Sequence, residues 1–340
     1  MNKPERELQL LAWLRAQSTL AEPEIRILAG DASFRRYYRV TSATNGGSEV
    51  LVDAPPPESL EPFHSVALAY AETGLSVPQV KAVDAQLGAM LLEDLGDTLL
   101  LQTECAAYDR YIQAIDLLPQ VMAVQRTRLG VIPKYDRVLL EKENSLFTEW
   151  LLTTHLGIEL SAAERALWEN FTRVINNNAL QQPQVGVHRD YHSRNIMVKA
   201  DDSLALIDFQ DAVQGAITYD LVSLLRDCYV CWPDDFVEGL LAYAHELFNE
   251  KGLISDHVSL TDFRRWFDLM GLQRHTKASG IFARLYHRDG KAGYLNDIPQ
   301  TVRYIAQVAV YYDELREYGR WIEQRILPML EPVVEQQTSL

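Results

Sequence analysis

One short segment constrains the fold of this 340-residue chain more than any other. It reads HRDYHSRN at residues 188–195, and LIDFQD follows at residues 206–211, after two apolar stretches that flank a turn at Asp201-Asp202. Apolar runs on either side of such a turn predict a β-hairpin. The hairpin has Asn195 at the start of its first strand and Asp208 at the end of its second.

This spacing suits phosphoryl transfer, which needs a group beside the acceptor hydroxyl and metal ligands that gather the phosphate charge. Asp190 would serve the acceptor, while Asn195 and Asp208 would supply a neutral and a charged oxygen ligand to Mg²⁺. A polar loop that merely caps two strands is the alternative, and the combined spacing disfavours it. A second His-Arg-Asp, at residues 287–289, lacks an Asn five residues later and a following strand pair, so we exclude it as the catalytic loop.

The rest of the chain divides into two regions of different predicted secondary structure. The first shows a helical pattern over residues 6–16, strand-like stretches at 25–31, 35–42 and 48–54, a helical stretch at 59–73, and strands at 79–84 and 89–93. Helical patterns dominate after Gly96, at residues 103–128, 138–155 and 161–176, and again after the hairpin. We therefore predict an α+β, protein-kinase-like two-lobe fold, with a β-rich N-lobe at residues 1–95 and a mainly helical C-lobe at residues 96–340.

Charge and cysteine content narrow the range of partners. The chain has 32 Lys and Arg against 47 Asp and Glu, a net charge of −15, which disfavours nucleic acids and anionic membrane surfaces. No apolar run reaches the roughly 18 residues of a membrane span, and the N-terminus lacks a signal-peptide core. The three cysteines, Cys105, Cys228 and Cys231, suit a reducing compartment and form no zinc pattern. We expect a cytoplasmic protein with small-molecule partners and no protein partner.

The segment HRDYHSRNIMV, together with ALIDFQDA and YDLVSLL, resembles the catalytic region of aminoglycoside phosphotransferases, choline kinases and related small-molecule kinases. The resemblance covers about residues 25–227 and implies ATP as co-substrate and Mg²⁺ as cofactor. It implies that Asp190 is the catalytic base and that Asn195 and Asp208 bind the ion. It further implies that His188 and Asp220 support the catalytic loop structurally.

The nucleotide end departs from the pattern of this family. Ser33 follows Gly30 where a phosphate-covering loop belongs, so it is a candidate phosphate contact, with an ordinary β-turn as the alternative. Glu93 and Leu95 fall in the hinge between the lobes, where backbone groups of the family pair with adenine.

The lysine that most kinases carry on the third strand is missing. Its expected position holds Asp53 or a neighbouring residue, and no Lys lies between Lys3 and Lys81. One of three arginines could meet the phosphate charge instead, and we favour Arg36 over Arg35 and Arg39. Without such a group, the chain would be a nucleotide-binding module that does not turn over, although the intact Asp190, Asn195 and Asp208 disfavour this.

Residues 30–40, 50–59 and 273–299 also resemble bacterial kinases that phosphorylate the anomeric hydroxyl of N-acetylmuramate and N-acetylglucosamine in cell-wall sugar recycling. The resemblance implies an amino-sugar substrate. The lactyl carboxylate of N-acetylmuramate needs a cation, and Arg284 and Arg288 share one face of a basic helix. A solvated basic face is the alternative. A kinase of another small alcohol stays open, but the positive charge disfavours aminoglycosides, which are polycations.

Overall fold

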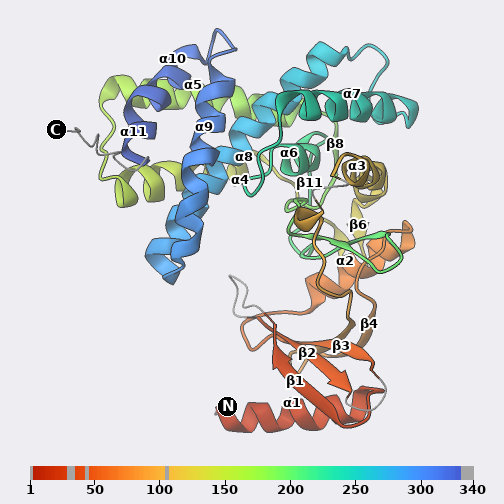
Figure 1. Cartoon of the computed structure of the whole chain (residues 1–340). Coiled ribbons are helices and arrows are strands. Elements are labelled where there is room, and N and C mark those ends of the chain that lie inside the picture. The colour runs from red at the N-terminus through yellow and green to blue at the C-terminus, as the bar shows by residue number, and fades with distance from the viewer. Residues whose placement is uncertain (1–2, 29–34, 43–45, 104–106, 331–340) are drawn as a thin grey trace, which may run out of the picture. The chain divides into compact units, whose positions relative to one another are not determined.

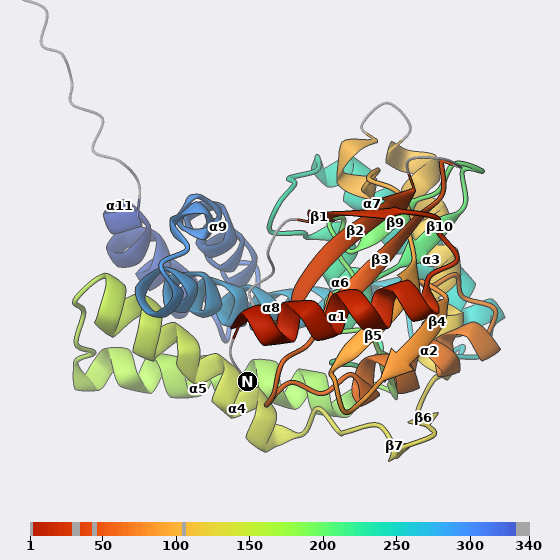
Figure 2. The ribbon, with the colours of Figure 1, turned by 90° about the horizontal axis from the view of Figure 1, so that it is seen from below.

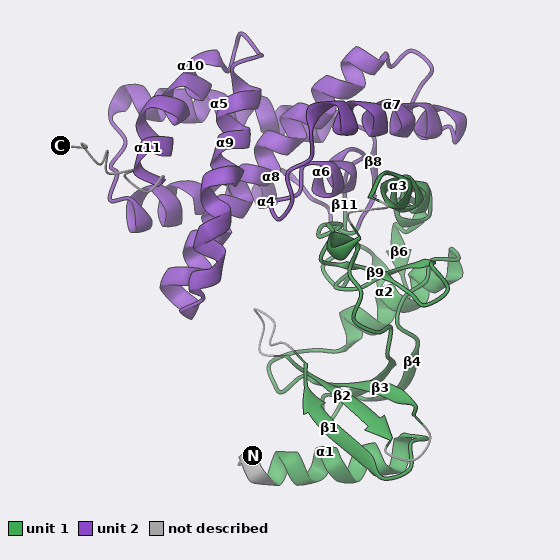
Figure 3. Ribbon diagram, viewed as in Figure 1, with its two compact units in different colours: residues 1–133, 188–213 green, residues 134–187, 214–340 purple. Residues whose placement is uncertain are grey.

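The computed structural model of the chain describes residues 3–28, 35–42, 46–103 and 107–330. Two compact units make up the chain (Figures 1 and 3): residues 1–133 and 188–213 form unit 1, and residues 134–187 and 214–340 form unit 2. The predicted catalytic hairpin therefore belongs to the same compact unit as the N-terminal sheet. The predicted lobe boundary near residue 95 falls inside unit 1.

Unit 1 contains a five-stranded antiparallel sheet in the order β1-β2-β3-β5-β4. Its strands are β1 (Pro23–Ile27), β2 (Arg36–Ser42), β3 (Ser48–Asp53), β4 (Val80–Asp84) and β5 (Ala89–Glu93). The helix α1 (Lys3–Gln17) runs across one face of this sheet (Figures 1 and 2). Because successive side chains of a strand alternate between faces, every second residue packs under α1, and Leu14 of the helix meets Val40, Leu51 and Leu91 there.

The remaining elements of unit 1 are short except for two helices. They are α2 (Glu61–Glu72), η1 (Leu100–Gln102), α3 (Ala107–Ala123), the strand pair β6 (Arg126–Thr127) and β7 (Gly130–Val131), and the hairpin β9 (Ile196–Val198) and β10 (Leu204–Leu206). All six residues of β9 and β10 are buried apolar side chains, as the predicted hairpin requires.

Unit 2 is mainly helical. Its helices are α4 (Arg137–Leu146), the π-helical η3 (Phe147–His155), α5 (Ala162–Gln181), α6 (Tyr219–Leu225), α7 (Asp234–Glu250), α8 (Leu260–Asp289), η4 (Ala292–Asp297), α9 (Ile298–Ala309), α10 (Arg316–Trp321), η5 (Ile322–Ile326) and α11 (Leu327–Leu330). The strand β8 (Gln184–Val187) pairs with β11 (Val213–Ala216). Local signals set the start and end of the longest helix: the Ser259 hydroxyl and the Asp262 carboxylate form a capping box, and Gly290 ends α8 at φ 70°.

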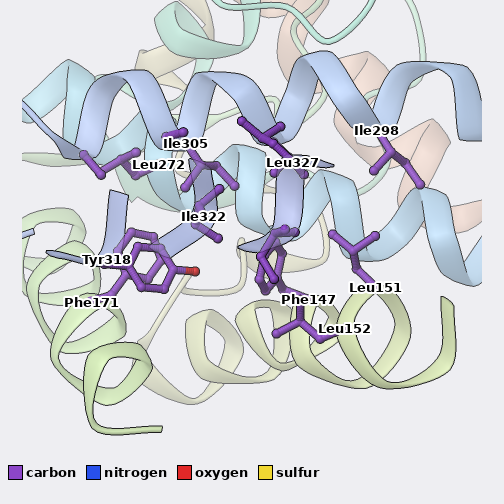
Figure 4. Packing of buried hydrophobic residues seen from close by; sticks show 14 of the residues in the cluster. Phe147, Leu151, Leu152, Phe171, Leu272, Ile298, Ile305, Tyr318, Ile322 and Leu327 are labelled. Carbon is purple, nitrogen blue, oxygen red and sulfur yellow. The ribbon is translucent and has the colours of Figure 1, made fainter. Parts of the chain in front are cut away.

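A large apolar core holds the helices of unit 2 together (Figure 4). The rings of Phe171 and Tyr318 stack with their centroids 3.9 Å apart. Residues of η3, including Phe147 and Leu151, pack into the same core, which also contains Leu272 of α8. The long helix α8 is thereby fixed by its neighbours along its length.

Candidate active site

The catalytic loop joins β8 to β9 and is held by hydrogen bonds within unit 1. The Tyr191 side chain is fully buried, and its hydroxyl donates to the backbone carbonyl of Ala114 on α3 at 2.7 Å. The backbone of Arg189 is left-handed, with φ 81°, which turns the chain sharply before Asp190. The Asn195 side-chain amide then donates to the backbone carbonyl of Asp190 at 3.1 Å. Asp190 and Asn195 thus belong to one closed turn.

The two predicted metal ligands lie side by side at the open end of the hairpin. The Ile207 backbone amide donates to the Asn195 carbonyl at 3.1 Å, so the first strand begins where the second ends. The Asn195 amide nitrogen lies 3.4 Å from a carboxylate oxygen of Asp208. The backbone of Asp208 is left-handed, with φ 62°, and the Gln210 amide donates to its second carboxylate oxygen at 2.7 Å.

This donor set fits Mg²⁺. Magnesium takes hard oxygen ligands and usually binds to one or two protein groups, with substrate phosphates and water completing its shell. Asp208 offers a carboxylate and Asn195 an amide oxygen, and both residues line the same pocket. Within the described part of the chain, no group of three or more His, Cys, Asp or Glu side chains could hold a metal by itself, so a site that borrows ligands from a phosphate is the one that these residues suit.

The imidazole of His188 is buried and neutral in this arrangement. Burial lowers the pKa of its imidazole to about 4, so the ring carries no charge at neutral pH. The Asp190 backbone amide donates to its Nδ1 at 3.3 Å, and aromatic rings of Tyr70, Tyr191 and Phe209 surround it. These contacts support the prediction that His188 braces the loop.

A pocket of about 390 Å³ extends from the sheet to the metal-ligand pair. Its apolar wall is formed by residues of the sheet, of α2 and of the hairpin, together with residues that flank these elements or η1: Leu28, Tyr37, Val50, Phe63, Pro78, Leu92, Leu99, Met197 and Ile207. The predicted hinge residues Glu93 and Leu95 line it, as do Asn195 and Asp208. The cavity is mostly apolar with a few polar groups, as is typical of a small-molecule or cofactor site.

Residues of β3 that the sequence analysis considered for the lysine position lie on opposite faces of the sheet. Asp53 is fully buried on the face covered by α1, where Arg6 donates to it at 2.9 Å and 2.5 Å and Arg36 also forms an ion pair with it. A lysine that binds phosphate must point to the pocket, so of the positions that the prediction left open, a neighbour of Asp53 and not Asp53 itself corresponds to the missing lysine. On β3 the pocket side holds Val50 and, by the alternation of the strand, Val52.

The arginines predicted to meet the phosphate charge also separate. Arg36 lies opposite Asp53 in the register of β2 and β3 and does not line the pocket, whereas Arg39 does. Arg35 is paired with Glu58 at 3.1 Å. Ser33 lies outside the described residues. Tyr37 and Arg39 share a face of β2, but the alternation of the strand does not by itself say which face turns to the pocket.

The predicted acceptor residues lie on α8 in unit 2. Arg284 is half-buried, and burial together with the nearby Arg288 lowers the pKa of its guanidinium. Arg288 is exposed and donates twice to the adjacent Asp289 at 2.8 Å. The second His-Arg-Asp therefore forms the last turn of a helix, which agrees with its exclusion as a catalytic loop.

About two turns before Arg284, α8 carries a buried cation, one of the basic residues that the sequence places in this segment. The Lys277 ammonium donates to the Tyr219 hydroxyl at 3.1 Å and lies 3.6 Å from the carboxylate of Glu143. Glu143 in turn accepts from the Tyr135 hydroxyl. Glu143 sits in the amphipathic pattern of α4, and its burial depends on tertiary packing.

Asp220 and the cysteines of unit 2 lie outside the residues that line the pocket. Asp220 is buried in the first turn of α6, and its role in supporting the catalytic loop stays a prediction. Cys228 is a buried free thiol whose pKa is raised by burial, and Cys231 is an exposed free thiol. No helix among the described residues is long and apolar enough to span a membrane.

The chain is similar to known phosphotransferases. Residues 24–253 match the model of the phosphotransferase enzyme family. A protein of Neisseria meningitidis named N-acetylmuramate/N-acetylglucosamine kinase is 39% identical over 318 residues, which cover 92% of this chain and 93% of that protein. Proteins of the same name from Pseudomonas putida and Pseudomonas aeruginosa are each 41% identical and cover 87% and 86% of this chain.

Solved structures confirm the predicted fold class. The choline kinase LicA from Streptococcus pneumoniae superposes with a TM-score of 0.63 at 14% identity, over 89% of this chain and 99% of that one. An ethanolamine kinase of Plasmodium vivax gives 0.64 at 11% identity, over 92% of this chain and 89% of that one. At such identities the likeness concerns the fold alone, which is the two-lobe fold of small-molecule kinases.

Proposed function

The chain belongs to the phosphotransferase enzyme family, and we propose that it is an ATP- and Mg²⁺-dependent kinase of N-acetylated amino sugars. The acceptor is the anomeric hydroxyl of N-acetylmuramate and N-acetylglucosamine, and the products are the sugar 1-phosphate and ADP. Three relatives that share 39–41% of their residues with most of this chain carry the name of such a kinase. The reaction belongs in the cytoplasm, in the recycling of cell-wall sugars toward UDP-sugar precursors.

The observation that carries the proposal is the hydrogen-bonded group formed by Asp190, Asn195 and Asp208. Asn195 joins the other two, because its amide donates to the Asp190 carbonyl at 3.1 Å and lies 3.4 Å from the Asp208 carboxylate. The group that serves the acceptor and the groups that hold the ion are therefore fixed relative to one another. Positioning and charge stabilisation account for nearly all of the catalysis of phosphoryl transfer.

In the reaction, the anomeric oxygen forms a bond to the γ-phosphorus of ATP, and the bond between that phosphorus and the β–γ bridging oxygen breaks. Asp190 orients the anomeric hydroxyl and takes its proton late in the transfer, when the new bond to phosphorus has withdrawn electron density from the oxygen and made the proton acidic. Asn195 and Asp208 hold Mg²⁺, which when bound stabilises negative charge on the phosphate oxygens. His188, kept neutral by burial, holds the loop without competing for the proton.

We propose that the acceptor carboxylate of N-acetylmuramate pairs with a cation of α8. Arg284 suits this role better than Arg288, because Arg288 is exposed and already donates twice to Asp289. A half-buried guanidinium beside a second cation gains more from an anionic partner than an exposed one does. N-acetylglucosamine lacks the carboxylate, so this contact selects between the two sugars.

The proposal is tested by measuring ADP release with a panel of acceptors at saturating ATP and Mg²⁺. N-acetylmuramate and N-acetylglucosamine should turn over, and phosphorus NMR should identify a 1-phosphate. The methyl glycoside of N-acetylglucosamine, whose anomeric oxygen is blocked, should not react. If choline, an amino acid or an aminoglycoside reacts while the free sugars do not, the chain is a kinase of another alcohol. If ATP binds and no acceptor reacts, the chain is a nucleotide-binding module.

Asp190→Asn tests the assignment of the base. Removal of a general base typically costs a factor of about 10² to 10⁴, so kcat should fall by that range while the dissociation constant of ATP stays within about twofold. Asp201→Asn is the matched control, since Asp201 is an exposed carboxylate in the turn of the same hairpin. Retention of wild-type kcat by Asp190→Asn would rule out Asp190 as the base.

A further inference from the structure

Arg39 is the one Lys or Arg among the described residues that line the pocket, so it is the obvious substitute for the missing lysine. Its contacts contradict that role. Its terminal nitrogens donate to Asp97 at 2.8 Å, to Asp94 at 3.1 Å and to the Gly96 carbonyl at 3.0 Å. Its Nε lies 2.7 Å from the other carboxylate oxygen of Asp94. The edge of the guanidinium is therefore occupied by protein oxygens.

The charge around Arg39 gives a second reason. Asp94 and Asp97 together outweigh the one positive charge of the arginine, and Glu93 lines the pocket beside them. A wall with a net negative charge repels a triphosphate. It suits a neutral base and the ribose hydroxyls, which donate hydrogen bonds to carboxylates.

The position of Arg39 along the sheet gives a third reason. In the register of the sheet, Arg39 lies opposite Val50 of β3, and Val50 lies opposite Leu92 of β5, directly before the hinge. All three residues line the pocket. Arg39, Val50 and Leu92 therefore lie at the hinge end of the pocket, where the base lies in this family.

We propose that the face of the Arg39 guanidinium stacks on the purine ring of the nucleotide, held in that plane by Asp94 and Asp97. A guanidinium whose edge is bound by carboxylates can still stack by a face on an aromatic ring. Its side chain is only 22% exposed, and that of Asp94 is 5% exposed, so the stacking surface is ordered before the nucleotide binds. Binding then costs little side-chain entropy. This inference rests on the proposed use of ATP.

The test compares adenosine with ATP, because adenosine lacks the phosphates. Arg39→Met should weaken both ligands by the same factor, about tenfold, which corresponds to a desolvated cation–π contact of roughly 1.4 kcal/mol. Both dissociation constants are measured by calorimetry without any acceptor. The KM for the sugar should stay unchanged at saturating ATP. Arg39→Lys, which keeps the charge and loses the plane, should behave like Arg39→Met.

Arg26→Met is the matched control. Arg26 lies opposite Arg39 in the register of β1 and β2, so it shares that face of the sheet, but it is exposed, paired with Glu24 and does not line the pocket. It removes the same charge and should leave both affinities within twofold. Thermal melting of each variant confirms that it is folded, and if Arg39→Met does not fold, Arg39→Lys gives the same comparison.

Two results would overturn the inference. If ATP is weakened and adenosine is not, Arg39 acts on the phosphates. If neither is weakened, Arg39 contributes nothing to nucleotide binding. Because the measurement needs no acceptor, failure of every sugar to turn over would reject the proposed function without affecting this result.

Discussion

Gly280 and Gly271 lie on the same helix, α8, and replacing each of them by alanine should change stability in opposite directions. A Cβ at Gly280 would lie 2.4 Å from the carbonyl carbon of Leu146 and 2.5 Å from the backbone nitrogen of Phe147. These are backbone atoms at the junction of α4 and η3, so no side-chain rotation relieves the contact. A Cβ at Gly271 would meet a methyl group of Val222 at 3.6 Å and a ring carbon of His275 at 3.9 Å, which are ordinary van der Waals distances.

The size of each effect follows from two terms. Alanine is favoured over glycine inside a helix by about 1 kcal/mol, and this term applies to both positions. At Gly280 the two helices must separate by about 1 Å to restore normal contact, and overpacking of a tight core costs about 3 kcal/mol at the upper end of its usual range. We expect Gly280→Ala to lower the free energy of unfolding by about 2 kcal/mol and Gly271→Ala to raise it by about 1 kcal/mol.

The measurement is urea denaturation followed by circular dichroism, with thermal melting as a check. A unit of this size changes its melting temperature by roughly 2–4 °C per kcal/mol, so the two variants should differ by several degrees, with the wild type between them. Equal stability of Gly280→Ala and the wild type would refute the close approach of α8 to the backbone of Leu146. Destabilisation by both variants would refute the use of helix propensity to explain their difference.

Two further predictions concern buried charge. Asp53→Asn should destabilise the protein by about 3 kcal/mol, the low end for a buried pair that loses one partner, because Arg6 stays buried while Arg36 is partly exposed. Asp201→Asn, at an exposed carboxylate, is the control. Equal denaturation midpoints for the two variants would contradict this prediction. Burial lowers the pKa of His275 to about 3, so as pH falls below 6.5 the unfolded state takes up a proton that the folded state refuses, and stability falls. His275→Asn should therefore flatten the pH dependence of stability, measured by urea denaturation between pH 6.5 and 5. The slope should fall by up to one proton, which is about 1.4 kcal/mol per pH unit. If the variant and the wild type have parallel profiles, His275 does not cause the pH dependence.

Local patterns account for the parts of the site that the sequence predicted. The apolar runs around Asp201-Asp202 fold into β9 and β10, and the spacing of Asn195 and Asp208 then follows from the hairpin register, in which Ile196 pairs with Leu206. Every step lies within about 20 residues. The five strands were likewise predicted from short stretches, but their order, with β5 between β3 and β4, was not. That order depends on contacts between segments far apart in the sequence.

The sequence did not show which face of β2 and β3 turns to the pocket, and therefore on which side Asp53 lies. A strand pattern identifies which residues alternate, but the face that turns to the pocket depends on which face another element covers. Here α1 covers the face of Leu51, and Arg6 of that helix binds Asp53, so Val50 and Arg39 take the pocket side. Nothing within β2 or β3 reveals the position of α1. Arg36 and Arg39 lie on opposite faces of β2, so a wrong choice of face puts Arg36 in the pocket in place of Arg39.

The face of the sheet on which each arginine lies also affects how the nucleotide can be bound. Because Arg36 is paired with Asp53 on the face that α1 covers, and Arg39 is paired at the hinge with Asp94 and Asp97, neither arginine offers an unpaired charge to a triphosphate. Among the described residues that line the pocket, the features suited to the phosphates are then the oxygen ligands of Asn195 and Asp208. We therefore propose that, among the described residues, phosphate charge is met chiefly through the metal that Asn195 and Asp208 would hold, whereas the base is held by the apolar wall and by Arg39. On this proposal, the absence of the strand lysine shifts binding energy from the phosphates toward the base.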